Sequence, residues 1–542
     1  MTSPNTPALV AEPEREPEHL QGEPPAMTHP EVLRALSGIL LGMFVSVLAM
    51  SVVSSSLPKI ITDLGGNQSA FTWVVTATLL TSTISTPIWG KLADLTNRKT
   101  LIQIALIISV LSAAAAGFAQ DAGQLITFRA FQGIGAGGLQ SLSAILIADI
   151  ISPRQRGRYM GLMGSIMGIG MVGGPVLGGF LTDAINWRWN FFVGLPFAVA
   201  SIIVLQMTLR LPKRPRGTEK LDIAGATLIS VGIAALLLWI TFAGTEFDWI
   251  SWQTAALAGG ALLVLAIAVL VELRVKTPLI PMYLFKNRTL VLAVIGSVAV
   301  GVAMFGSSVF LSQYMQLSRG KTPTESGLYT IPMVVGLFLS STVGGQLISR
   351  TGRYKPYMVG GAISLTAGLL LLSTLDYRTS FVLVSIYLFI LGAGVGLLMQ
   401  NMVLATQNTL HIKDSGSGTS TVTFFRSLGG AIGVSALGAI LGHSVQGSLK
   451  EGITEIAPQL AEQGVDTSAL QSGSGALPDL SVLPPILVEV IEKAYANGIA
   501  EIFLAAVPLA VIALICVSLI KEVPLDHRSG IDQLKDLEPA KA

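Results

Sequence analysis

The stretch Gly90-Lys91-Leu92-Ala93-Asp94-Leu95-Thr96-Asn97-Arg98-Lys99 lies between two long apolar segments. A hydrophilic turn this short predicts two helices that cross a membrane and meet on one side of it. A second version begins at Gly345, at an offset of 255 residues (345 − 90), and aligns Arg353 with Arg98. The recurrence predicts an internally duplicated membrane protein. The alternative is that any cytoplasmic membrane turn is basic and contains glycine.

The composition places the chain in a membrane. Of its 542 residues 51% are hydrophobic and only 12% are charged, whereas soluble domains carry about 25% charged residues. The single cysteine, Cys516, cannot form an internal disulfide, and no Cys/His spacing suggests a metal site. No Walker A or HExxH sequence occurs. We therefore expect a polytopic all-α protein that is not an enzyme, with no cofactor, no metal and no nucleic-acid partner.

Fourteen apolar runs are long enough to span the hydrocarbon of a bilayer. They lie near 36–57, 72–92, 100–120, 125–149, 160–182, 190–210, 221–243, 253–273, 289–312, 326–349, 355–375, 381–404, 421–443 and 499–520. Six spans with short turns need only about 180 residues, so the repeat offset leaves room for one extra helical pair. Lys and Arg concentrate in the connections on one side, which places both termini in the cytoplasm.

This pattern predicts two six-helix bundles with an inserted helix pair. The predicted segments are a disordered cytoplasmic tail at 1–33, an N-terminal bundle at 34–212, the inserted pair with basic flanks at 213–288, a C-terminal bundle at 289–522 and a cytoplasmic tail at 523–542. The C-terminal bundle includes a long external loop at 444–498, with an amphipathic piece near Ile486–Ala496.

Charges at the ends of the second and fourth helices predict a cytoplasmic gate. A carboxylate at a helix end can pair with cations or cap a neighbouring helix, so Asp94, Arg98 and Asp149 can latch helices together in one conformation. The alternative is a set of solvated loop charges. With the turn and its repeat, the predicted gate comprises Gly90, Asp94, Arg98, Lys99, Asp149 and Arg353.

Arg129 lies inside the external end of the fourth helix, in the stretch Arg129-Ala130-Phe131-Gln132-Gly133. An ionisable residue at membrane depth predicts a functional site, because exposure to lipid is costly. Gln132 shares its helix face at i+3, and Gln140 continues the polar character inward. The alternative is that Arg129 snorkels to the interface.

Small residues recur in the fifth helix, in the stretch Gly170-Met171-Val172-Gly173-Gly174-Pro175-Val176-Leu177-Gly178-Gly179. Glycines four apart let helices approach closely, and Pro175 removes a backbone donor and bends the helix. Gly170, Gly174 and Gly178 form one smooth stripe. We interpret it as a hinge or sliding surface between the bundles, with ordinary small-residue packing as the alternative.

Polar and aromatic residues in several helices are candidates for a substrate cavity. They are Gln140, Gln313, Gln400, Asn401, Phe425 and Arg426. The alternative is plain helix packing or contact with lipid.

Taken together, the turn, the Arg129 stretch and the Gly-Pro stretch resemble the major facilitator superfamily, and its fourteen-helix drug:proton antiporters in particular. Weaker support comes from Trp73-Val74-Val75-Thr76, Trp187-Arg188-Trp189-Asn190-Phe191-Phe192 and Phe424-Phe425-Arg426-Ser427-Leu428-Gly429-Gly430.

This resemblance implies the major facilitator fold and proton-coupled export of amphipathic drugs or toxic compounds by alternating access. It implies that Gly170, Gly174, Pro175, Gly178 and Gly179 are the antiporter signature. It also assigns proton coupling to Arg129, Gln132, Gly133 and Asp149. The expected setting is a monomer in the cytoplasmic membrane of a bacterium, with protons and an amphipathic or lipid substrate as partners.

The chain departs from these relatives in its first helix. Many of them carry an Asp in a segment ending Leu-Pro; here Leu57-Pro58 sets the register and the corresponding position is Ala49. A proton-coupled exporter of cations needs a group that binds either a proton or the cation. The missing acid leaves a second hypothesis open, in which the cargo is a lipid or an endogenous metabolite.

Overall fold

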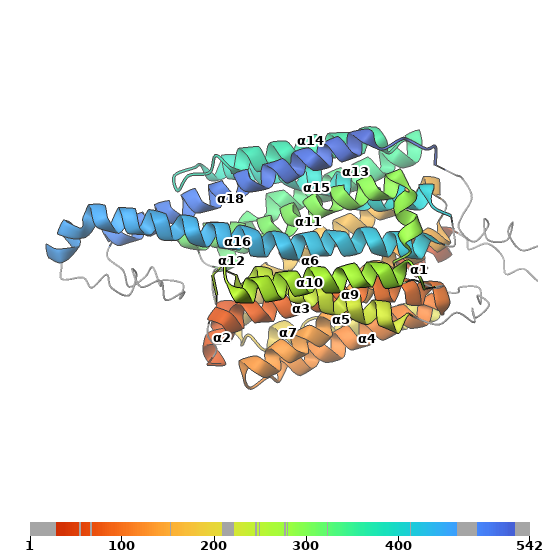
Figure 1. Ribbon diagram of the computed structural model, residues 1–542, viewed down its shortest axis with the longest axis horizontal. Helices are drawn as coiled ribbons and strands as arrows, with labels where there is room; N and C mark the ends of the chain where they lie inside the picture. Colours follow the sequence, from red (N-terminus) through yellow and green to blue (C-terminus); the bar gives the residue numbers. More distant parts are fainter. Residues whose placement is uncertain are drawn as a thin grey trace, which may run out of the picture.

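The computed structural model is an elongated bundle of helices (Figure 1). It describes residues 29–525, apart from 54–55, 66–67, 152, 209–221, 244–246, 249, 276–277, 279, 322, 412–413 and 463–484. Most of the two predicted tails lies outside this part, as do the side chains of Asp94 and Asp149. The described residues form helices and no β-strand, as expected for an all-α protein.

The first half of the chain contains α1 (His29–Ser51), α2 (Leu57–Asp63), α3 (Gln68–Leu95), α4 (Arg98–Gly117), α5 (Ala122–Ile150), α6 (Pro153–Ala184), α7 (Trp189–Phe192) and α8 (Leu195–Thr208). The predicted insertion contains α9 (Ile223–Phe242) and α10 (Trp252–Glu272). The second half contains η1 (Met282–Lys286), α11 (Arg288–Gln313), the π-helix η2 (Tyr314–Ser318), α12 (Pro323–Tyr329), α13 (Ile331–Thr351), α14 (Lys355–Leu372), α15 (Phe381–Thr409), α16 (Ser415–Glu462) and α18 (Pro485–Leu519).

Twelve helical segments of the described chain are long and apolar enough to cross a membrane. The apolar part of α1, Leu36–Ser51, is shorter, and α3 is long enough but diluted by many Ser and Thr residues. With these two, the described helices account for the fourteen predicted spans. Several begin where a polar side chain accepts a hydrogen bond from the first turn, as Asp121 does for α5 and Asn287 for α11.

The same helix pairs pack in both halves of the chain. In the first half α3 packs on α5, α4 on α5, α1 on α6 and α1 on α8. In the second half the corresponding pairs are α13 with α15, α14 with α15, α11 with α16 and α11 with α18. This repetition confirms the internal duplication predicted from the two turns. The two six-helix bundles meet along α6 with α13 and along α3 with α16.

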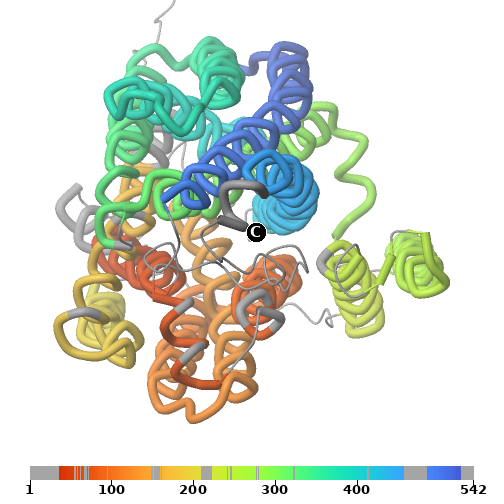
Figure 2. Tube along the Cα trace, turned by 90° about the vertical axis from the view of Figure 1, so that its left-hand side faces the viewer, coloured from red at the N-terminus to blue at the C-terminus, as the bar shows by residue number. Residues whose placement is uncertain are grey.

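The inserted helices lie at the side of the bundles (Figure 2, yellow-green). α9 packs against α3 of the first bundle and α16 of the second, so it covers one seam between them. α10 packs on α9 and exposes apolar side chains such as Leu262 and Leu263. Apolar exposure suits a helix whose outer face contacts lipid.

The predicted external loop 444–498 is largely helical. α16 has 48 residues, which at 1.5 Å per residue is about 72 Å, more than twice the roughly 30 Å of bilayer hydrocarbon. It therefore extends beyond the bundle together with the start of α18 (Figure 1, left). The two extensions pack through Ile453 against Leu487 and Ile491, which lie four residues apart on one face of α18. The segment expected to be a loop is therefore helical at 444–462, where apolar residues recur at helical spacing, and the amphipathic piece expected near Ile486–Ala496 lies at the start of α18.

Candidate functional site

The cations of the predicted gate contact their own bundles. Arg98 is buried, and its Nε donates to the carbonyl oxygen of Ala93 at 2.9 Å, near the end of α3. Lys99 Nζ donates to the carbonyl oxygen of Gln206 at 2.9 Å, which ties α4 to α8. Arg353, the repeat partner of Arg98, is exposed and lies 3.8 Å from Glu522. Asp94 and Asp149, whose side chains are outside the described part, stay predictions as gate residues.

Small residues join the two bundles at this end. Gly90 of α3 lies against Ser420 of α16, so closely that a Cβ on Gly90 would collide with the serine side chain. Ser420 Oγ is also 3.0 Å from Ser141 Oγ of α5. Along the other seam, Ser165 Oγ of α6 lies 2.8 Å from Thr342 Oγ1 of α13. These contacts hold the bundles together on the side of the basic turns.

Arg129 is buried between α5 and α1. Its Nη1 donates to Gln132 Oε1 at 2.8 Å and to the carbonyl oxygen of Ala49 at 3.3 Å. The snorkelling alternative is therefore wrong, because the guanidinium is held inside the protein. Gln132 contacts Arg129 as the i+3 spacing predicts.

Gly133 has a packing role in this structure. A Cβ at Gly133 would collide with Thr78 and Thr81 of α3, so the glycine allows α3 and α5 to approach closely. Thr81 Oγ1 donates to the carbonyl oxygen of Ala130 at 2.7 Å across the same contact.

The predicted stripe Gly170, Gly174 and Gly178 faces α1, inside the first bundle. A Cβ at Gly174 would collide with Ser51, whose Oγ donates to the carbonyl oxygen of Gly170 at 2.8 Å. Ser56 Oγ donates to the carbonyl oxygen of Gly178 at 3.0 Å. The prediction that this stripe separates the two bundles is therefore wrong. Sequence spacing located a smooth face but not the neighbour that covers it.

Other glycines of α6 face the second bundle. A Cβ would meet Ser341 at Gly164, Leu337 at Gly168 and Thr324 at Gly179. Gly179, which belongs to the predicted Gly-Pro signature, therefore does lie at the boundary between bundles. Pro175 lies within α6, as predicted.

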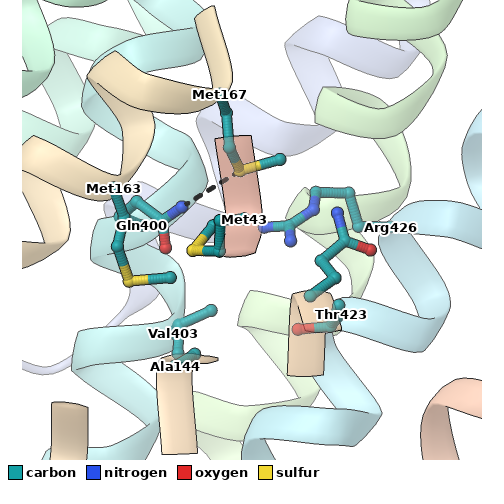
Figure 3. Close-up of a pocket in the computed structure, with 9 residues that line it drawn as sticks. Met43, Ala144, Met163, Met167, Gln400, Val403, Thr423 and Arg426 are labelled. Atoms are coloured by element: carbon teal, nitrogen blue, oxygen red, sulfur yellow. Dashed lines mark hydrogen bonds between the residues drawn. The ribbon is translucent and has the colours of Figure 1, made fainter. Parts of the chain in front are cut away.

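A narrow pocket lies between the bundles (Figure 3). Its side chains are closely packed in this conformation and leave no space for a water molecule. Its lining comes from α1, α5 and α6 of the first bundle and from α15 and α16 of the second. The residues are Met43, Gln140, Ala144, Met163, Met167, Gln400, Val403, Thr423 and Arg426.

Three of the predicted cavity residues meet in this pocket. Gln140, Gln400 and Arg426 come from α5, α15 and α16, and Arg426 reaches toward Met43 (Figure 3). The sequence prediction did not include the methionines. Met163 and Met167 lie four residues apart on α6, but this spacing is equally typical of ordinary packing.

The other predicted cavity residues lie elsewhere. Asn401 donates to the carbonyl oxygen of Leu397 in its own helix at 2.6 Å. Phe425 packs against Phe285, on the side of the inserted helices. Gln313 lies at the far end of α11 and does not line the pocket. These three residues do not line this pocket, and their assignment to a substrate cavity stays a prediction.

Comparison with known proteins identifies the fold and the family. A sequence model described as the Major Facilitator Superfamily matches residues 39–434. The chain belongs to the major facilitator superfamily. It is 33% identical over 523 residues to the multidrug transporter protein MdtP of Bacillus subtilis, covering 94% of this chain and 96% of that protein. It is 29% identical to multidrug resistance protein 3 of the same organism, covering 89% of this chain and 93% of that one.

A solved structure of the superfamily has the same fold. The proton:xylose symporter XylE bound to a sugar analogue matches with a TM-score of 0.56 at 13% identity, over 94% of this chain and 99% of that one. At this identity the likeness concerns the fold alone. The predicted family and fold are thus confirmed: this is a multi-pass membrane transporter of the major facilitator superfamily, with multidrug transporters among its relatives.

Proposed function

We propose that this major facilitator protein exports amphipathic compounds across the cytoplasmic membrane of a bacterium by alternating access, in exchange for protons. The observation that carries the proposal is the pocket between the bundles, which takes its lining from both of them. A site shared by two rigid bundles changes its access when one bundle rocks against the other. The multidrug exporters among the relatives support an apolar cargo.

The contacts of Gly90 and Ser165 support closure on the side of the basic turns. By the positive-inside rule this side is cytoplasmic, and both termini lie there. The conformation is then one in which cargo cannot return to the cell interior.

Proton coupling is assigned to the buried Arg129 and its partner Gln132. A buried guanidinium responds strongly to the charge of nearby groups, because the low dielectric inside the protein strengthens electrostatic interactions. Asp149 is proposed as a separate protonatable group of the coupling pathway, since it ends the same helix twenty residues later (149 − 129), about 30 Å from Arg129.

Transport by purified protein in liposomes tests the proposal. A neutral and a cationic amphipathic dye are loaded, a pH gradient is imposed, and dye movement is followed with and without an uncoupler. We expect gradient-dependent movement of dye that the uncoupler stops and that Arg129→Ala abolishes. Arg378→Ala is the matched control, since the side chain of this arginine is 74% exposed in the connection between α14 and α15. Dye movement that does not depend on the pH gradient would contradict proton coupling. Equal dye movement by the wild type and the Arg129→Ala protein would contradict the role of Arg129.

The second hypothesis keeps the fold and the cycle but replaces the drug with a lipid or an endogenous metabolite. It is favoured by the lack of an acidic residue among those that line the pocket, which removes the usual partner of a cationic drug. A strain lacking the protein would then show altered envelope lipids or metabolite secretion without increased drug sensitivity. The reverse pattern would reject this hypothesis.

A further inference from the structure

We propose that the closely packed site between the bundles, once they move apart to admit a ligand, binds an amphipathic anion. Arg426 holds the anionic group and the methionines hold the apolar body. The inference rests on the proposed export function for its biological role. The binding itself is a separate property, and it can be measured without transport.

Arg426 has hydrogen-bonding capacity that the protein does not use. Its side chain is only 3% exposed, and its Nη1 donates to the carbonyl oxygen of Met399 at 3.1 Å. Its Nε is buried and has no hydrogen-bond partner among the described residues. A guanidinium carries five N–H donors in one plane, a geometry that matches carboxylate, sulfate or phosphate oxygens.

The charge of Arg426 has no counter-ion in the described structure. It forms no ion pair with a described carboxylate, and every other residue that lines the pocket is neutral. A cation enclosed at membrane depth is costly unless it is paired or hydrogen-bonded. An anionic ligand would supply the missing charge, whereas a cationic ligand would add to the cost.

Two amides can add donors beside the guanidinium. Gln140 Oε1 accepts a long hydrogen bond of 3.4 Å from Ser427, so the amide nitrogen of Gln140 is the group left to bind a ligand. Gln400 Nε2 lies 3.8 Å from Met167 Sδ, and a thioether sulfur is a weak acceptor. Both amides can therefore turn toward an anion without breaking a strong bond.

The opposite side of the pocket suits an apolar body of variable shape. Met43, Met163 and Met167 are buried around it (Figure 3). Methionine is unbranched and polarizable, so it adapts to irregular ligands. A charged end and an adaptable apolar side together define an amphipathic ligand.

Arg129 does not offer the same site. Its Nε is also buried without a hydrogen-bond partner among the described residues, but its Nη1 is held by the side-chain oxygen of Gln132 and by the carbonyl oxygen of Ala49. Arg129 also does not line the pocket. It lies eleven residues before Gln140 on α5 (140 − 129), about 16 Å along the helix. The anion site is therefore assigned to Arg426 alone.

Binding of two matched amphiphiles to the full-length protein tests the inference. Octyl sulfate and octyltrimethylammonium share a tail and differ in the sign of the headgroup. Their dissociation constants are measured by calorimetry on protein in nanodiscs of phosphatidylcholine, with empty nanodiscs subtracted. We expect octyl sulfate to bind at least about tenfold more tightly than octyltrimethylammonium, since hydrogen bonds to a charged group are strong enough for such a difference.

Three variants identify the residue responsible. Arg426→Gln should weaken octyl sulfate binding at least about tenfold, and Arg426→Lys should retain part of it, because the charge remains without the planar fork. Arg378→Gln, the same substitution at an exposed arginine, should bind as the wild type does. The unfolding temperature of each variant shows that it is folded. Equal binding of the two amphiphiles, or undiminished octyl sulfate binding by a folded Arg426→Gln protein, would overturn the inference.

The same preparation separates this inference from the proposed function. Gradient-driven movement of the neutral dye without octyl sulfate binding rejects the anion site and leaves export standing. Octyl sulfate binding that depends on Arg426, without movement of the neutral or the cationic dye, supports the anion site and rejects export of neutral and cationic compounds.

Discussion

Nη1 of Arg129 lies 3.3 Å from the carbonyl oxygen of Ala49, and this contact links α5 to α1 inside the first bundle. Ala49 is the position at which many of the resembled antiporters carry an Asp. The buried Arg129 thus contacts the backbone of α1 at a position where this chain has an alanine instead of an acidic residue. Its side-chain partner is instead the neutral Gln132, at 2.8 Å.

The first prediction concerns this pair. Gln132→Leu removes the side-chain acceptor of Arg129, and a lost hydrogen bond to a buried charge costs about 1.5–3 kcal/mol. We expect a lower unfolding temperature and loss of proton-coupled dye efflux. Gln313→Leu is the control for stability, because the oxygen of Gln313 is buried without a hydrogen-bond partner in the described structure. If both substitutions change the unfolding temperature equally, the Arg129–Gln132 hydrogen bond does not contribute to stability.

The second prediction concerns the glycine stripe of α6. A Cβ at Gly174 would collide with Ser51, whereas a Cβ at Gly173 would meet nothing within 4 Å. Gly174→Ala should therefore destabilise the protein by about 1–3 kcal/mol through overpacking. Gly173→Ala should be neutral or slightly stabilising, because alanine favours a helix over glycine. Thermal unfolding of both variants in nanodiscs measures this difference. Equal unfolding temperatures would show that the close α1–α6 contact at Gly174 does not limit the side chain at this position.

The third prediction concerns closure between the bundles. Gly90→Ala should push α3 away from Ser420 of α16 and open the pocket on the side of the basic turns. A cysteine introduced by Val403→Cys in a Cys516→Ser background should then react faster with a water-soluble maleimide.

Gly360→Ala on α14 is the control, since a Cβ there would meet nothing within 4 Å. Unchanged labelling in the Gly90→Ala protein would show that this contact does not hold the bundles closed.

The fourth prediction compares the two copies of the repeated turn. Arg98 is 4% exposed and donates to the carbonyl oxygen of Ala93, so Arg98→Ala should cost about 1.5–3 kcal/mol. The side chain of Arg353 is 71% exposed and lies 3.8 Å from Glu522, so Arg353→Ala should cost less than about 1 kcal/mol. Unfolding measurements on the two variants decide this, and a larger loss at Arg353 would contradict the structural asymmetry.

The backbone conformation also differs between the two copies of the turn, at the residue just before each arginine. Asn97 has an extended backbone and its side chain accepts from the N–H of Lys99, which starts α4. Gly352, its repeat counterpart, has a φ of +69° and ends α13 in the left-handed conformation. Glycine adopts that conformation without a steric penalty, and it supplies no cap of its own.

Much of the architecture could be predicted from the sequence. Apolar runs must form helices in a bilayer, because lipid offers no hydrogen bonds to an open backbone. The spacing of Gly90 and Gly345 indicated the duplication, which the repeated helix pairs confirmed. The extent of α16 and α18 beyond 444 and 498 was not predicted, because hydropathy falls where a helix leaves the apolar region although the helix continues.

The sequence by itself thus determined the helices, their number and the duplication that relates them. Only the tertiary structure decided that Gln140, Gln400 and Arg426 meet in one pocket while Asn401 and Phe425 face elsewhere. The physical reason is that these helices are apolar on nearly every side, so no polar stripe shows which face points inward. The rotation of each helix about its own axis is set by the side chains of its neighbours, and those are brought together only in the folded protein.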